Sequence, residues 1–281
     1  MIFNKIKKML NSGLKWILAL TVSFIILFPL YWIFISSITP AGELFKQPID
    51  YLPDNPTISN YIYLIYNVGL IEKVVSTLII IGTTLIIGTI ICVMASYGFA
   101  RYKSKGLSIA FMLILFSMLI PNVVTARPLY DFMRRVGLYD TYTGLIILYI
   151  SKIIPFTILI LRNFISEIPI SIEEAAAIDG ATFLQKIYHI ILPLLKPAIA
   201  IVAITNFITC LNEFFIPLFY ANNIQVLSTA ITQLPLKDNM YSVPWDLVSS
   251  MGWIIILPII IFVAIFEKQI MNGIMAGGVK A

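Results

Sequence analysis

Two ionisable side chains stand out within apolar segments of the chain: Lys152 between residues 145 and 165, and Glu213 between residues 198 and 220. A charged group in hydrocarbon costs about 2.5 kcal/mol or more, so each is a functional-site hypothesis. Counted at about 1.5 Å per residue from the outer ends of their segments, the two lie at similar depth. We expect Lys152 and Glu213 to approach each other or to line one polar cavity, although Lys152 could instead extend toward the outer headgroups.

Uncharged polar residues share the second of these segments. Asn206 and Asn212, with Thr205 and Thr209, give it a polar side. Amides at such positions could hydrogen-bond to the hydroxyl groups of a substrate or to a neighbouring helix. Lys152, Asn206, Asn212 and Glu213 are therefore our candidates for a substrate path.

The chain lacks the residue clusters that acid–base or metal chemistry needs. It has one histidine, His189, and its two cysteines, Cys92 and Cys210, lie in apolar runs. A phosphate-binding glycine loop is missing from the sequence as well. We therefore predict a transport subunit, not an enzyme, with no catalytic residues, no metal site and no cofactor of its own. Energy for uphill transport has to come from an ATPase on another chain or from an ion gradient.

The composition of the chain indicates the class of protein in which these residues lie. The 281 residues are 59% hydrophobic and 12% charged, with a mean hydropathy of +0.94. These values are typical of an integral membrane protein. We predict an all-α protein with a single transmembrane domain over residues 1–281 and six membrane-spanning helices at residues 14–38, 74–99, 107–124, 145–165, 198–220 and 247–266.

The distribution of Lys and Arg predicts the orientation. With both termini in the cytoplasm, twelve of the 19 Lys and Arg residues lie inside and six outside, the other being Lys152. Cytoplasmic enrichment of this kind is the usual rule. Three of the outer six, Arg127, Arg134 and Arg135, lie in a segment that we expect to form an interfacial helix. The chain is thus expected to be multi-pass in the cell membrane, with the 166–196 loop in the cytoplasm.

The cytoplasmic loop contains the stretch from Ser171 to Pro193. Ser171 and Glu174 have the spacing of a capping box, which predicts a helix start. Gly180 permits a left-handed backbone and ends that helix. A second helix should follow until Pro193 and Pro197 interrupt it. From these residues alone, the loop is two short helices meeting at a glycine bend, which could bind a partner or merely link two spans.

The same stretch resembles a known motif. Glu174-Ala175-Ala176, then Gly180 after three residues, then Ile190-Ile191-Leu192-Pro193 after nine more, matches every fixed position of the EAA loop of ATP-binding cassette importer permeases. Further likeness, to the MalG-like half of the binding-protein-dependent carbohydrate importers, lies in Asn212-Glu213-Phe214 and in the carboxyl-terminal residues 273–280. The resemblance covers nearly the whole chain.

The resemblance implies a type I importer permease fold in which the loop is a coupling helix that docks on a cytosolic ATPase. The residues expected at or near this docking site are Glu173, Glu174, Ala175, Ala176, Asp179, Gly180 and Ala181. Gly277, Gly278 and Lys280 are a second candidate contact, since the tail reaches the ATPase pair in some relatives.

It also implies a set of partners. The protein partners are a second, MalF-like permease, two copies of the ATPase that carries ATP and magnesium, and an extracytoplasmic solute-binding protein. The substrate is a carbohydrate, expected to be an oligosaccharide by analogy with the family. Membrane lipid surrounds the chain, and nucleic acid is not expected as a partner.

Other functions stay open at this level. A secondary, ion-coupled transporter is one alternative, although the chain lacks an internal repeat and the paired acidic residues of ion coupling. An importer permease for another solute, such as glycerol phosphate, is a second. A membrane-embedded enzyme or a structural subunit is disfavoured, because the first lacks catalytic clusters and the second would not need the bend.

Overall fold

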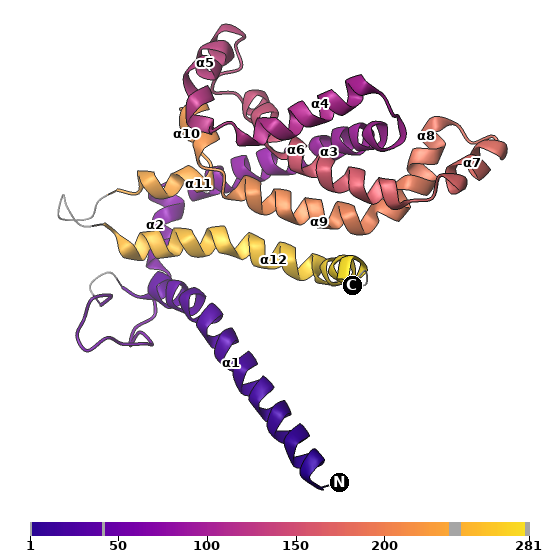
Figure 1. Cartoon of the computed structure of the whole chain (residues 1–281). Coiled ribbons are helices and arrows are strands. Elements are labelled where there is room, and N and C mark those ends of the chain that lie inside the picture. The colour runs from indigo at the N-terminus through magenta and orange to yellow at the C-terminus, as the bar shows by residue number, and fades with distance from the viewer. Residues whose placement is uncertain (1, 41–42, 236–242, 279–281) are drawn as a thin grey trace. The chain divides into compact units, whose positions relative to one another are not determined.

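A computed structural model describes the backbone of residues 2–40, 43–235 and 243–278, and the side chains within 14–40, 43–235 and 243–267. These described residues form helices and connecting segments without strands (Figure 1). The α-helices are α1 (Ile2–Ile38), α2 (Ser59–Asn67), α3 (Leu70–Arg101), α4 (Lys105–Phe116), α5 (Asn122–Arg135), α6 (Tyr142–Glu167), α7 (Ile170–Ile178), α8 (Phe183–Lys186), α9 (Leu192–Leu211), α10 (Phe215–Tyr220), α11 (Leu227–Ala230) and α12 (Trp245–Gly278).

Several of these helices have the length and the apolar composition of a membrane span. Among the described residues, five helical segments are long and apolar enough to cross a bilayer, or six if α4 and α5 form one broken span. The first lies in α1 and ends at Ile38 as predicted, but the helix itself begins at Ile2, well before the predicted start at residue 14. α4 continues as a 3-10 turn to Leu119, and the chain then bends by 105° into α5, at the expected break around Pro121. The all-α membrane fold is therefore confirmed.

Two compact units can be distinguished in the chain, and the expectation of one permease domain stays a prediction. The first unit comprises residues 1–70 and 233–256. Within it, Ser250 Oγ donates to the Ser37 carbonyl oxygen at 3.0 Å, and Asn60 donates to the same oxygen at 3.1 Å. These buried hydrogen bonds connect α1 to α2 and to the start of α12.

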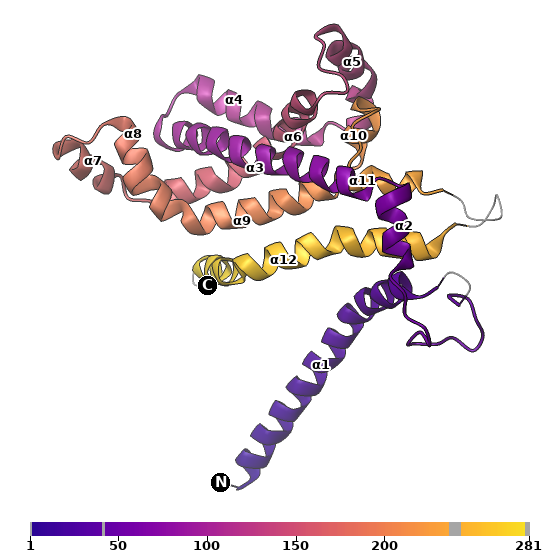
Figure 2. The same cartoon turned by 180° about the vertical axis from the view of Figure 1, so that it is seen from behind.

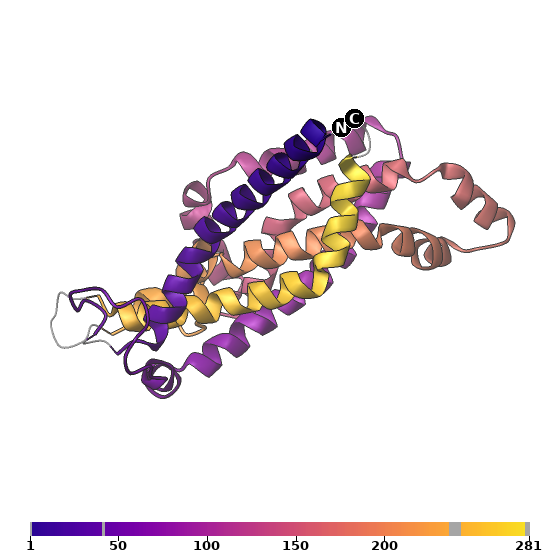
Figure 3. The ribbon, with the colours of Figure 1, turned by 90° about the horizontal axis from the view of Figure 1, so that it is seen from below.

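The second unit comprises residues 71–232 and 257–281. In it α3, α4, α6 and α9 lie side by side, with α7 and α8 at one end and α5 and α10 at the other (Figures 1 and 2). Apolar side chains from α3, α6, the π-helical segment Ile187–Ile191 and α9 form its core: Cys92, Val93, Tyr97, Ile158, Leu161, Ile165, Ile187, Ile191, Leu195, Ala198 and Val202. Seen from below, the α7–α8 bend projects from the end of these helices (Figure 3).

The fifth predicted span differs from the observed helix at both ends. Pro193 and Pro197 do not interrupt the helix, which runs on through both prolines as α9. Five residues of π-helix, Ile187–Ile191, come directly before it. The change of hydrogen-bond register falls where the missing N–H of Pro193 removes one α-helical bond. At the other end α9 stops at Leu211, and Asn212–Phe214 separates it from α10.

The predicted capping box at Ser171 is wrong. α7 begins at Ile170, and Pro169 at its N-cap position makes no side-chain cap. A capping box does occur in the loop, eleven residues later, where Thr182 and Gln185 cap each other at the start of α8. Gly180 has φ +84°, so the predicted left-handed bend between the two helices is confirmed.

Candidate functional site

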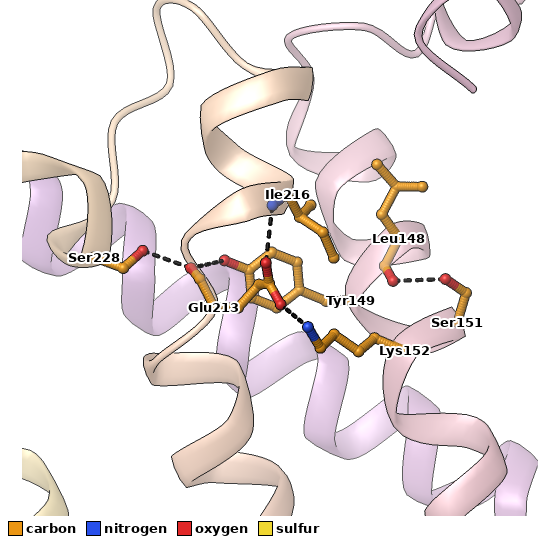
Figure 4. Close-up of polar contacts among 7 residues, drawn as sticks. All are labelled: Leu148, Tyr149, Ser151, Lys152, Glu213, Ile216 and Ser228. Atoms are coloured by element: carbon orange, nitrogen blue, oxygen red, sulfur yellow. Dashed lines mark hydrogen bonds and ion pairs between the residues drawn. The ribbon is translucent and has the colours of Figure 1, made fainter. Parts of the chain in front are cut away.

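Lys152 and Glu213 meet in the second unit, beside the break between α9 and α10. The ammonium of Lys152 on α6 forms an ion pair with Oε2 of Glu213 in the break between α9 and α10 (Figure 4). The Glu213 side chain is 3% exposed and that of Lys152 is 34% exposed. Their predicted proximity is confirmed.

Glu213 also holds the α9–α10 break in place. Its Oε1 accepts a hydrogen bond from the backbone N–H of Ile216 at 2.9 Å, in the first turn of α10. Its backbone carbonyl accepts from the hydroxyls of Tyr149 at 3.4 Å and Ser228 at 2.7 Å (Figure 4). One residue thus joins α6, α10 and α11, and its carboxylate has a partner at each oxygen.

A cavity of about 760 Å³ lies beside this pair, within the second unit. Its polar lining residues are Ser117, Asn122, Thr125, Ser151, Lys152, Thr205, Asn206 and Thr209, and its aromatic ones are Phe156, Phe215 and Tyr220. The volume falls in the range of small-molecule sites, and the mixture of apolar walls with a few polar groups is typical of them. Lys152 is the charged residue among the lining residues, and Glu213 behind it balances that charge.

The substrate-path candidates separate in the structure. Lys152 and Asn206 line the cavity, whereas Asn212 caps the end of α9 and is not among the lining residues. Asn206 is 2% exposed and its Nδ2 donates to the hydroxyl of Thr157 on α6 at 2.8 Å. That contact is the interhelical alternative considered for Asn206 from the sequence.

Pro155 removes one backbone hydrogen bond from α6, a feature that the sequence reasoning missed. Pro155 lies inside α6 and lines the cavity together with Ser151, four residues earlier. Because proline has no N–H, the Ser151 carbonyl lacks its α-helical donor. The combination of an intramembrane proline with a polar residue four positions before it could have signalled the feature.

The candidates for the ATPase-docking site lie in α7 and the bend after it. Glu174, Ala175, Asp179 and Gly180 are exposed, and Ala176 and Ala181 are partly buried. Two large apolar side chains close to the bend, Ile178 and Leu184, are 87% and 68% exposed. Small and apolar exposed residues around a fixed glycine bend form a surface that can pack closely against a partner.

Glu173, unlike Glu174, is not part of this exposed surface. It is 6% exposed and forms an ion pair with Arg101 at the end of α3, contacts that the sequence reasoning did not anticipate. Gly277 and Gly278 lie in the last turn of α12, and Lys280 lies outside the described residues. Among the side chains that the structure describes, no group of three or more His, Cys, Asp or Glu is placed to hold a metal ion.

Long apolar helices around a polar, charge-balanced cavity define an integral membrane protein of the transport type. The family profile described as "Binding-protein-dependent transport system inner membrane component" matches residues 88–272. The chain belongs to this family of permeases, as the EAA-like motif between residues 174 and 193 led us to expect.

Individual relatives align over most of the chain. A sulfoquinovosyl glycerol transport system permease protein of Agrobacterium fabrum is 29% identical over 90% of this chain and 89% of its own length. A trehalose transport system permease protein of Mycobacterium tuberculosis is 32% identical, over 90% and 92%. The fold is similar to a chain of a bacterial ABC transporter involved in import of the acidic polysaccharide alginate, with TM-score 0.77, 23% identity, and coverage of 93% and 96%.

Proposed function

We propose that this chain is the membrane-spanning permease subunit of an ATP-driven importer for carbohydrate, of oligosaccharide size. The observation that carries this proposal is the cavity between α6, α9 and α10, whose polar groups and aromatic rings suit a ligand with hydroxyl groups on an apolar ring. Similarity to permeases named for trehalose and for sulfoquinovosyl glycerol supports the same class of substrate.

The chain carries no energy source in this scheme. ATP and magnesium bind to two copies of a cytosolic ATPase, which dock on the exposed residues of the α7–α8 bend, including Glu174, Asp179 and Gly180. A second permease of the same family completes the translocation path, and an extracytoplasmic solute-binding protein delivers the carbohydrate. Both termini of the chain are then cytoplasmic, which agrees with the bias of Lys and Arg toward the segments on that side.

Co-purification tests the docking surface. The chain is expressed with its partners, and the amount of ATPase retained through affinity purification is measured for Glu174→Lys and Gly180→Pro. Both variants should lose most of the ATPase, because one reverses a charge on the exposed face and the other imposes a negative φ where the native φ is +84°. Glu72→Lys, a charge reversal at an exposed site in the first turn of α3, should retain it. Retention by all three variants would refute the docking surface.

A further inference from the structure

α7 is attached to the rest of the second unit in an unusual way. A surface helix normally buries a stripe of apolar residues. Within α7 the buried residue is instead a carboxylate, Glu173, while Ile170, Ile172 and Ile178 are 58%, 41% and 87% exposed. The orientation of this helix therefore depends on polar contacts of Glu173 more than on apolar packing.

Both oxygens of the Glu173 carboxylate are bonded to α3. Oε1 accepts from Nη2 and Nε of Arg101 at 2.6 and 2.7 Å, and Oε2 accepts from the hydroxyl of Tyr97 at 2.6 Å. The side chains of Arg101 and Glu173 are 10% and 7% exposed. Charge-assisted bonds of this kind are short and directional, so they fix an angle as well as a distance. We call Tyr97, Arg101 and Glu173 the Arg101 cluster.

The Arg101 cluster contacts two further elements. Nη2 of Arg101 also donates to the carbonyl oxygen of Ile168 at 3.0 Å, at the end of α6. The ring of Tyr97 lies edge-on to the ring of Phe183, the first residue of α8, with centroids 5.5 Å apart. Four helices thus meet at the end of α3, and both arms of the bend are joined to it.

α3 and α6 are in turn packed closely along their length. Ser96 Oγ donates to the Ile158 carbonyl oxygen at 3.2 Å. A Cβ added to Gly88 would lie 2.8 Å from the side chain of Ile153, the residue after Lys152 in the cavity wall. A displacement of α3 therefore reaches the helix that lines the cavity.

We infer that the Arg101–Glu173 ion pair is the connection through which movement of the α7–α8 bend reaches α3 and α6, so that Glu173 is a positioning residue for transport and not an ATPase contact. This inference rests on the proposed function. Without the pair, α7 can tilt about Pro169 and Gly180 while α3 stays in place, because no buried apolar residue of α7 opposes the tilt.

Reconstitution of the complete importer in liposomes separates these roles. Three quantities are measured: ATPase retained on the complex, its hydrolysis rate, and carbohydrate transported per ATP. Glu173→Gln should retain the ATPase and hydrolyse ATP while transport per ATP falls about five- to tenfold, the lower range of a typical coupling free energy. The double variant Arg101→Glu with Glu173→Arg exchanges the two charges and should restore part of the lost transport per ATP. Glu72→Gln, the same substitution at an exposed carboxylate on α3, should leave all three quantities unchanged.

The outcomes distinguish the alternatives. Loss of ATPase retention in Glu173→Gln, to the same degree as in Glu174→Lys, would overturn the inference because the pair would then only shape the docking surface. A normal transport ratio in Glu173→Gln would also overturn it. Should that variant not fold, Tyr97→Phe removes one bond and keeps the ion pair, and an unchanged transport ratio there would count against the cluster. If no ATPase is retained by the native complex, the proposed function fails, whatever the variants do.

Discussion

Lys152 on α6 and Glu213 after α9 neutralise each other beside the cavity, with the carboxylate almost fully buried and the ammonium partly open to the cavity. Removing one partner of such a pair leaves a buried charge without compensation, which costs about 3 kcal/mol or more. Lys152→Met should therefore destabilise the protein strongly and impair transport. The double variant Lys152→Met with Glu213→Gln should be no worse than Lys152→Met, because the glutamine oxygen can still accept from Ile216.

Thermal unfolding in detergent measures this prediction. Cys92 and Cys210 are buried and free, so a thiol-reactive fluorophore reports the loss of structure around them. Fully additive losses from the two single substitutions would show that the ion pair contributes nothing to stability or transport.

Gly144, close to the start of α6, should not tolerate a side chain. A Cβ at this position would lie 2.0 Å from the carbonyl oxygen of Leu138, a backbone atom that cannot rotate away. Gly144→Ala should lower the free energy of unfolding by about 3 kcal/mol, the upper end of typical overpacking costs. Gly82→Ala is the matched control, since nothing lies within 4 Å of its added Cβ and alanine favours a helix. Equal melting temperatures for the two variants would be inconsistent with the close contact.

Asp140 should make the segment between α5 and α6 and the segment after α10 sensitive to acid. Partial burial raises the pKa of its carboxyl, but hydrogen bonds from the backbone N–H groups of Asn222, Ile224 and Asn223 and from the Asn223 side chain outweigh burial, so the pKa lies below its ordinary value. Stability from a lowered pKa is fully present above the unfolded pKa of about 3.9 and is lost as pH falls through the folded pKa.

The thermal stability of the native protein should therefore fall below about pH 4, in the range set by that unfolded pKa. Asp140→Asn should be less stable at neutral pH and should show a smaller loss on acidification. Asparagine is the suitable replacement because it tolerates the native φ of +57°. Identical acid profiles for the two proteins would exclude Asp140 as the source of the sensitivity.

The Asn206–Thr157 hydrogen bond should contribute to the contact between α9 and α6. Interhelical bonds in membranes average about 0.6 kcal/mol in double-mutant cycles, so Thr157→Val combined with Asn206→Leu should give a coupling of that size. Thr205→Val is the control, because the Thr205 hydroxyl bonds to Ile201 of its own helix. A coupling between Thr205 and Asn206 as large as that between Thr157 and Asn206 would argue against a specific bond.

Much of the fold follows from local sequence. Hydropathy locates the long helices, Gly180 identifies the bend, and opposite charges at similar depth predict that Lys152 meets Glu213. The break after Leu211 was missed because the apolar pattern continues through α10, and only the capping of Ile216 by Glu213 reveals where the helix stops. Pro193 was misread because a π-helical segment allows the chain to continue.

The role of Glu173 could not be predicted in the same way. Its partners Tyr97 and Arg101 lie 76 and 72 residues away in the chain, and neither spacing nor composition identifies a long-range pair. Two adjacent glutamates in one motif also look equivalent in sequence, whereas in the structure Glu173 is buried and Glu174 is exposed.

The energy source of transport distinguishes an ATP-driven importer from a secondary transporter. The chain is reconstituted in liposomes with its partner permease, ATPase and solute-binding protein, and accumulation of labelled oligosaccharide is followed. We expect accumulation only when ATP and magnesium are present on the ATPase side, with no effect of dissipating ion gradients. Accumulation that proceeds without ATP and stops when an ion gradient is dissipated would refute ATP-driven import and would favour a secondary transporter.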